Sequence, residues 1–382
     1  MYKIPYTPLP SFKKLLRVCL GTTTIDPKHL DKHWVKENEE GFWLSRSSHS
    51  MRLIARFRLQ ESKKESINVW IPAYFCNESL EPIKKEKVNI YFYPILENGT
   101  PDLRACKKQI SAHNTPDLFF GVHFFGREIN FSETSDFTKS FDAWFIEDAA
   151  HVLRTSVNMG KNSHFTFYSP HKILAVPDGS ILVFNKANFL ESKYSLERFK
   201  HLYEKKNEKN KKLNLFLLKW LIKRTLQKLG YRRNINNSLE IFDDNEIRLN
   251  PLNLTSGMSL FSKKLIMLEN SLESQINVRN ENYNFWRQFF ESNNLSGDEI
   301  FANHDLICPY LFGIQLKNRK EMLKALNLLN KYSIPAISWP DLPKEVYTEE
   351  SLYKCVIELK RHTLFLPIHS SMNIKSMQKY LN

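Results

Sequence analysis

The sequence predicts an α/β protein: a large domain around a mostly parallel sheet, of a seven-stranded type, and a smaller C-terminal α+β domain. β-type runs alternate with helical or turn-like stretches between residues 41 and 185, and the alternation resumes after residue 250. The runs are nearly continuous in apolar residues, as strands buried on both faces are. We expect strands at 68–75, 89–94, 118–125, 144–148 and 181–184.

The chain of 382 residues is long enough for more than one domain. We expect an N-terminal arm over 1–40, a large domain over 41–245 and a small domain over 250–382. The loop 234–253, rich in Asn, Asp and Pro, marks the boundary. In the small domain we expect one long helix over 258–292, a strand at 309–316, a helix at 319–332 and a strand at 363–368.

Composition narrows the functional classes. The apolar content of 42% is ordinary for a globular protein, and no apolar run is long enough to span a bilayer. The N-terminus lacks the apolar core of a signal peptide, so we expect a cytoplasmic protein. The five cysteines are scattered without a C-x-x-C pair, which argues against a disulfide framework or a zinc site.

The net charge of +14 favours anionic partners, and the segment 193–233 carries much of it. We interpret this segment as a solvated, basic helical face, because it shows no recognised nucleic-acid motif. Its apolar residues Leu215, Leu218, Leu221, Ile222 and Leu226 share one face of an amphipathic helix. We expect that face to pack on the protein's own core; contact with a membrane surface or a partner subunit is the alternative.

Lys172 is the first candidate functional residue. It lies in 165-FTFYSPHKILAVPDGSILVF-184, in a polar turn between two aromatic β-type runs. A lysine is costly to desolvate so close to buried strands unless its amine has a use. Asp148 and His151 follow another strand in 145-FIEDAAH-151, and ligands of open α/β sheets lie outside the carboxyl ends of the strands.

These residues suggest a pyridoxal phosphate site, although a capping Asp with a surface His is the ordinary interpretation of 145–151 taken alone. Lys172 would form a Schiff base with the cofactor. Asp148 would pair with the protonated pyridine nitrogen, and His151 would bond the phenolic oxygen. Ser47, Ser48 and His49 precede a helical run and offer a phosphate cradle, to which Ser169 would add a hydroxyl. A serine-rich helix start is by itself ordinary capping.

Two other known catalytic motifs also match the sequence around Lys172. Tyr168 and Lys172 form Y-x-x-x-K, as in short-chain dehydrogenases, but the G-x-G-x-x-G loop is absent. Ser169 and Lys172 form S-x-x-K, as in penicillin-recognising hydrolases, but S-D-N and K-T-G are absent. We discount both.

The motifs resemble the DegT-type sugar aminotransferases, a branch of the fold type I pyridoxal phosphate-dependent enzymes. The resemblance is carried by VWIPAYFCNES, GVHFFGRE, FIEDAAH and FTFYSPHKILAVPDGSILVF, and more weakly by SRSSHSMRLIA and by 366-LPIHSSMNIKSMQKYL-381. It runs from about residue 41 to the end. The family's site positions match Asp148, His151, Ser169, Lys172 and Asp178-Gly179, and PAYFC matches the strand end that covers the cofactor, which brings in Phe75.

The resemblance implies transfer of an amino group from an amino acid, in the first place glutamate, to a nucleotide-linked keto sugar for surface polysaccharide. It also implies a homodimer whose interface borders the active site, where Asn253 is a weak candidate for a cross-subunit residue. A histidine in place of the lysine marks family members that dehydrate, so Lys172 favours transamination. A catalytically silent relative that keeps the fold for binding or scaffolding stays an alternative, since Ser47-Ser48 departs from the family pattern.

Overall fold

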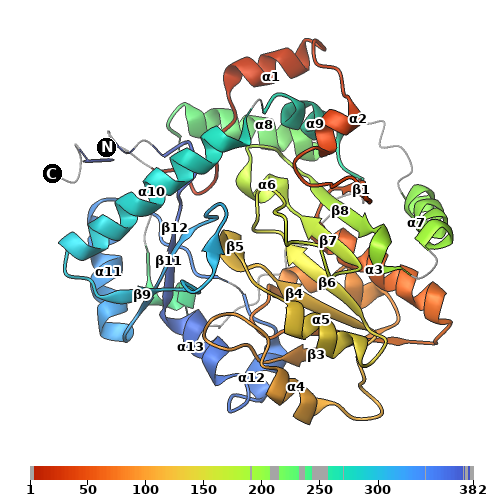
Figure 1. Ribbon diagram of the computed structural model, residues 1–382. Helices are drawn as coiled ribbons and strands as arrows, with labels where there is room; N and C mark the ends of the chain where they lie inside the picture. Colours follow the sequence, from red (N-terminus) through yellow and green to blue (C-terminus); the bar gives the residue numbers. More distant parts are fainter. Residues whose placement is uncertain are drawn as a thin grey trace.

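A seven-stranded sheet forms the centre of the computed structural model, in the order β1-β8-β7-β6-β4-β2-β3 (Figure 1). Strands β2, β3, β4, β6 and β7 are parallel, β8 is antiparallel to β7, and β1 is antiparallel to β8. The predicted α/β fold with a mostly parallel sheet is confirmed. The structure describes residues 4–189, 192–206, 215–231, 237–242, 257–269, 271–339, 341–372, 374 and 377–378.

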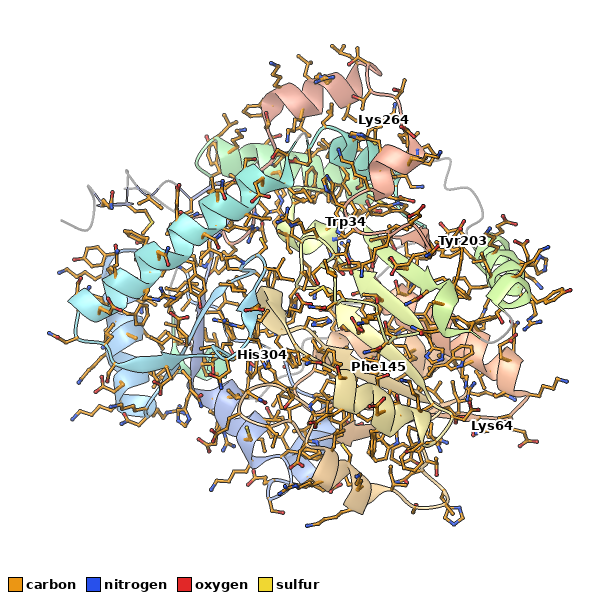
Figure 2. All side chains as sticks on the ribbon, viewed as in Figure 1. Trp34, Lys64, Phe145, Tyr203, Lys264 and His304 are labelled. Atoms are coloured by element: carbon orange, nitrogen blue, oxygen red, sulfur yellow. The ribbon has the colours of Figure 1, made fainter. Side chains whose placement is uncertain are left out.

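The five predicted strands are all present. The sheet strands are β1 (Glu39–Leu44), β2 (Ile67–Pro72), β3 (Val88–Tyr93), β4 (Leu118–Val122), β6 (Trp144–Ala149), β7 (Phe165–Tyr168) and β8 (Ser180–Asn185). Every residue of β4, β6, β7 and β8 is buried, which explains their unbroken apolar character. Figure 2 shows Phe145 of β6 inside the molecule and Lys64 at its edge.

Helices cover the sheet. Helix α3 (Ser47–Ser62) contacts β1, β2, β7 and β8, and α5 (Ser132–Lys139) contacts β6. The other helices before residue 231 are α1 (Phe12–Cys19), α2 (Pro27–Asp31), α4 (Leu103–Gln109), α6 (Pro170–Ile173), α7 (Ser192–Lys206) and α8 (Leu215–Lys228). Both α1 and α2 pack on α9 (Leu260–Met267), so the expected N-terminal arm lies against the body of the protein.

The C-terminal part contains a second sheet of β9 (Gly297–Glu299), β11 (Phe312–Leu316) and β12 (Thr363–Leu366), all antiparallel. Helices α10 (Leu272–Ser292), α11 (Arg319–Lys331), α12 (Lys344–Thr348) and α13 (Lys354–His362) accompany it. This confirms the strands and the helix expected after residue 309. The domain boundaries themselves stay predictions, and most of the loop 234–253 lies outside the described residues.

The single helix expected over 258–292 is wrong. The chain forms α9 and α10 as separate helices, because α9 ends at Met267 and Ser271, just before α10, is extended, with φ −147° and ψ 117°. Apolar spacing continues through both helices, so periodicity alone does not show the break.

The packing expected for the 215–226 face is confirmed for Leu221, which is partly buried against the core, and is wrong for the four exposed residues Leu215, Leu218, Ile222 and Leu226. Leu217 and Trp220 are the buried residues of α8, whereas Leu215, Leu218 and Ile222 are exposed. The amphipathic pattern is present, but its apolar stripe points away from the core. None of the helices in the described ranges is long and apolar enough to cross a membrane.

Candidate active site

The carboxyl ends of the parallel strands and of β1 meet at one edge of the sheet, as the strand directions require. The residues that follow them line a narrow cavity. Its lining residues are Ser47, Met51, Tyr74, Phe75, Cys76, Ser79, Val122, Phe124, Asp148, His151, Lys172 and Trp339. Five predicted site residues therefore meet here: Ser47, Phe75, Asp148, His151 and Lys172.

Lys172 and His151 form a hydrogen-bonded pair. The Nζ atom of Lys172, in α6, lies 3.2 Å from Nε2 of His151. The main-chain N–H of Phe125 points at Nδ1 of the same ring at 3.4 Å, so Nδ1 accepts and a neutral ring carries its proton at Nε2. That Nε2–H then donates to the lone pair of an uncharged Lys172 amine.

The electrostatics agree with an uncharged Lys172. Loss of hydration lowers the pKa of Lys172 from its usual value, against the raising effect of the Asp148 carboxylate. Burial holds the pKa of His151 well below its usual value, and a positive charge on Lys172 would lower it further. A neutral amine is the nucleophilic form of a lysine.

Asp148 lies at the end of β6, in the middle of the sheet, and is 6% exposed. Its carboxylate accepts the N–H of Ala150 at 2.8 Å, which fixes its orientation. Burial raises the pKa of Asp148 from 3.8 to about 6, although Lys172 and the Ala150 N–H act in the opposite direction. With a pKa of about 6 the carboxyl group is mostly ionised at neutral pH, so it can pair with a cationic group bound next to it.

Aromatic rings enclose His151. Tyr310 stacks on it with ring centroids 4.6 Å apart and an interplanar angle of 11°, and Phe125 stacks with centroids 5.3 Å apart. Trp339 meets the same ring edge-on, and its own ring lies 5.2 Å from the Lys172 amine. The rings hold the imidazole in place and keep water from the amine.

Arg279 of α10 contacts both the segment that carries Lys172 and the segment that carries Tyr310. It is 1% exposed, and its guanidinium donates to the carbonyl of Ile173 at 2.8 Å and to those of Pro309 and Tyr310 at 3.2 Å. One side chain thereby fixes both the residue after Lys172 and the ring stacked on His151. An arginine can do this because its donors form a rigid fork.

The turn Phe124–Gly126 also positions the stack. Phe125 has φ 53° and Gly126 has φ 89°, and the segment 307–310 lies directly against them. The N–H of Tyr310 donates to the carbonyl of Phe125, and that of Ile307 to the carbonyl of Gly126. A positive φ at a bulky residue such as Phe125 is uncommon and is held here by its surroundings.

Gly126→Ala is expected to destabilise the protein by about 3 kcal/mol or more, since a Cβ at this position would lie 1.8 Å from the carbonyl oxygen of Cys308. The matched control is Gly21→Ala, where φ is also positive but nothing lies within 4 Å. The control should lose about 1–2 kcal/mol, the ordinary cost of a left-handed alanine. Urea denaturation measures both, and equal losses would contradict the steric argument.

The start of α3 holds the predicted phosphate-binding residues. Ser47 lines the cavity, whereas Ser48, His49 and Ser169 do not. The hydroxyls of Ser48 and Ser169 are nevertheless buried and have no hydrogen-bond partner within the described parts of the chain. Buried hydroxyls are rarely left in this state, so these two are available to a ligand.

Asp178 has a structural contact. Its carboxylate accepts the N–H of Ser259 at 2.9 Å and the hydroxyl of Ser259 at 2.6 Å, which ties the acidic-Gly pair to the start of α9. Asn253 lies outside the described residues. Sequence reasoning missed Phe125, Arg279, Tyr310 and Trp339, because nothing in their spacing links them to Lys172.

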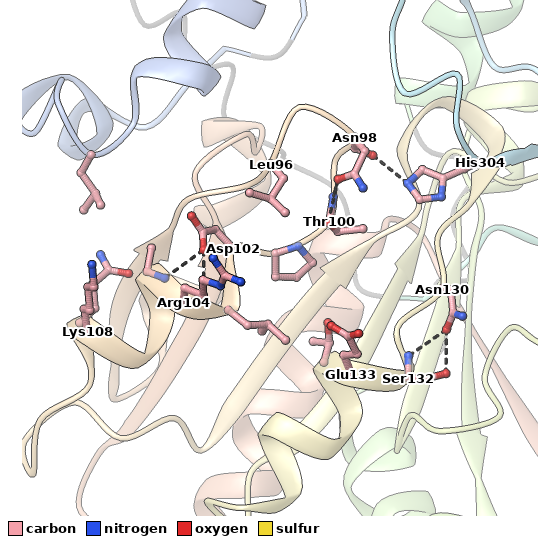
Figure 3. A pocket seen from close by; sticks show the side chains of 16 residues that line it. Leu96, Asn98, Thr100, Asp102, Arg104, Lys108, Asn130, Ser132, Glu133 and His304 are labelled. Carbon is pink, nitrogen blue, oxygen red and sulfur yellow. Dashed lines mark hydrogen bonds between the residues drawn. The ribbon is translucent and has the colours of Figure 1, made fainter.

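A second cavity, of about 980 Å³, shares no lining residue with the first as far as the structure describes the chain. Figure 3 shows it between the starts of α4 and α5 and His304. Its polar groups serve local turns: Asp102 accepts from Arg104, Asn130 from Ser132, and the carbonyl of Asn98 bonds His304 at 2.8 Å. These contacts account for Asp102, Asn130 and His304 without a ligand.

Comparison with known proteins gives a family match over part of the chain and a fold for the whole of it. Residues 95–237 match the DegT/DnrJ/EryC1/StrS aminotransferase family. A search of curated protein sequences finds no match. Several solved structures resemble the whole chain at low identity.

One similar structure is the PMP form of Spr1654 of Streptococcus pneumoniae, which is designated a sugar aminotransferase. It matches with a TM-score of 0.67 at 15% identity, and the match covers 100% of this chain and 96% of Spr1654. The GDP-4-keto-6-deoxy-D-mannose-3-dehydratase of E. coli gives 0.64 at 15% identity, over 100% and 99%. PseC of Helicobacter pylori, an aminotransferase in pseudoaminic acid biosynthesis, gives 0.62 at 15%, over 100% and 97%. These likenesses establish the fold type I architecture.

Proposed function

We propose that this chain is a pyridoxal phosphate-dependent aminotransferase acting on a nucleotide-linked keto sugar, on the premise that residues 95–237 match the DegT/DnrJ/EryC1/StrS aminotransferase family. The observation that carries the proposal is the convergence of Lys172, His151 and Asp148 in one cavity at the carboxyl edge of the sheet. The family and fold supply the cofactor class, and the cavity supplies the groups that it requires.

The residues of the cavity fit the cofactor. The Lys172 amine suits the aldehyde, and the Asp148 carboxylate suits a protonated ring nitrogen. Ser48 and Ser169 lie outside the cavity lining, but their buried hydroxyls have no partner among the described residues and, with Ser47 at the first turn of α3, suit a phosphate at a helix start. Phe75, which lines the cavity, suits the face of an aromatic ring.

Bound pyridoxal phosphate supplies an electrophilic carbon for an amine and a ring that accepts the electron pair released from a C–H bond. The chain supplies the rest. Asp148 would hold a proton at the ring nitrogen, and His151 would orient the Lys172 amine through Nε2. Lys172 would attach the cofactor, and its free amine would move a proton to and from the substrate as general base and acid.

Transamination is favoured over dehydration. The fold alone does not decide, because both an aminotransferase and a dehydratase share it. Lys172 supports transamination, since its amine can carry the proton that transamination moves. We infer glutamate as the donor and a diphosphate-bearing sugar as the acceptor, supported by the family and by the net charge of +14.

The assembly and the compartment are also proposals. We infer a homodimer from the family resemblance and from the prevalence of symmetric dimers. We infer a cytoplasmic location, supported by the five unpaired cysteines of the chain.

Borohydride treatment of the purified protein tests the proposal. The yellow protein is expected to lose its absorbance and to carry one cofactor per chain, fixed on the peptide that contains Lys172, as mass spectrometry of a digest would show. A colourless protein that binds no added cofactor would instead support the silent, binding or scaffolding alternative.

A further inference from the structure

Helix α8 exposes a continuous apolar stripe. Its members are spaced three or four residues apart, as residues on one helical face are, and each is between 44% and 63% exposed: Leu215, Leu218, Ile222, Leu226 and Leu229. The stripe is about 21 Å long at the rise of an α-helix. Monomeric surfaces rarely expose contiguous apolar patches of this kind without a use.

Helix α1 adds a second stripe next to the first. Phe12, Leu16 and Leu20 lie four residues apart and are 47% to 67% exposed. The two helices touch where the Lys228 amine lies 4.4 Å from the ring of Phe12 and donates to the carbonyl of Pro10. Figure 1 shows α1 and α8 together at one end of the molecule.

The charged side chains of α1 and α8 themselves have one sign, although one of them, Lys14, pairs with Glu269 at 2.6 Å. Neither α1 nor α8 contains an Asp or Glu, whereas they contain seven lysines and arginines: Lys13, Lys14, Arg17, Lys219, Lys223, Arg224 and Lys228. Lys219 and Lys223 are exposed beside the α8 stripe. A two-fold contact between copies would place this surface against itself, so its like charges would repel. An anionic partner complements it.

We propose that the stripes of α1 and α8 form a docking surface for an anionic phospholipid bilayer. An amphipathic helix with a leucine-rich face and flanking lysines lies in the plane of a bilayer interface, with its apolar side chains among the acyl chains and its cations at the headgroups. The α8 stripe has this pattern and points outward from the fold. The proposal does not depend on the aminotransferase activity, and its test uses no substrate.

Vesicle co-sedimentation of the full, cofactor-loaded chain tests the proposal. The protein is expected to bind mixed phosphatidylcholine–phosphatidylglycerol vesicles and to bind pure phosphatidylcholine weakly. The triple variant Leu218→Ser, Ile222→Ser, Leu226→Ser should lower the partition coefficient about tenfold or more. The matched control replaces Leu96, Val157 and Leu323, three exposed apolar residues elsewhere, by serine and should bind like the unchanged protein.

A charge variant tests whether the lysines beside the α8 stripe contribute to vesicle binding. Lys219→Glu with Lys223→Glu is expected to weaken binding to anionic vesicles about tenfold or more. Lys317→Glu with Lys320→Glu, which makes the same charge change on another exposed segment, should change it little. The proposal fails if the unchanged protein does not bind anionic vesicles, or if the triple serine variant binds them as well as the unchanged protein. Sedimentation that shows a dimer turned to monomers by that variant, without vesicle binding, would make the stripe a subunit interface instead.

Discussion

Lys172→Ala is expected to abolish transamination, with kcat/KM lowered by about four orders of magnitude or more. The variant loses both the amine that attaches the cofactor and the group that moves the proton. Steady-state assay of amino transfer from glutamate measures the loss. The hydroxyls of Ser48 and Ser169, which have no partner in the part of the chain that the structure describes, should still hold the cofactor's phosphate, so dialysis should remove cofactor from the variant slowly.

Two further experiments test the role of Lys172. Lys172→Arg keeps the positive charge but not a nucleophilic amine, so it should be as inactive as the alanine variant. Added small primary amines should restore part of the rate to Lys172→Ala, because an external amine can carry the proton. Near-normal turnover by either variant would remove Lys172 from the proposed role.

The sequence predicted the large sheet and the edge that carries the site for a physical reason. Parallel strands buried on both faces must be apolar throughout, so a polar residue at the end of such a run, as at Asp148, is visible in the sequence. Lys172 was visible for the same reason. Its cost of desolvation draws attention to it wherever the surrounding residues are apolar.

Other features leave no such signal. Arg279 and Tyr310 reach the site through contacts between segments far apart in the chain, and an arginine or tyrosine on a helix or in a loop is ordinary. The α8 stripe shows a related limit. Periodicity determines which residues share a helix face, but the direction of that face depends on packing with the rest of the fold.

Asp148→Asn is expected to leave the cofactor attached to Lys172 while lowering the rate about 100-fold or more. Attachment needs the Lys172 amine, which the variant keeps. An amide cannot hold a proton at the ring nitrogen as a carboxylate does, so the electron pair released from the substrate is less well stabilised. Absorbance spectra and single-turnover kinetics separate the two effects, and a variant that is both colourless and inactive would show that Asp148 acts through binding.

The same substitution has a second expected effect, on the stability of the cofactor-free chain. Burial raises the pKa of Asp148 from 3.8 to about 6, so the folded state disfavours the carboxylate. Below about pH 4 Asp148 is protonated in both the folded and the unfolded chain, so its burial costs no stability. The free energy of unfolding falls as the pH rises to about 6, and at neutral pH it is lower by about 3 kcal/mol at most. The amide side chain of the variant does not titrate, so Asp148→Asn should raise the free energy of unfolding at about pH 7.5 and have little effect at about pH 4. Urea denaturation at the two pH values measures the difference. If the variant were less stable than the parent at the higher pH, the attraction between the Asp148 carboxylate and Lys172 would stabilise the fold by more than the burial of the carboxylate costs.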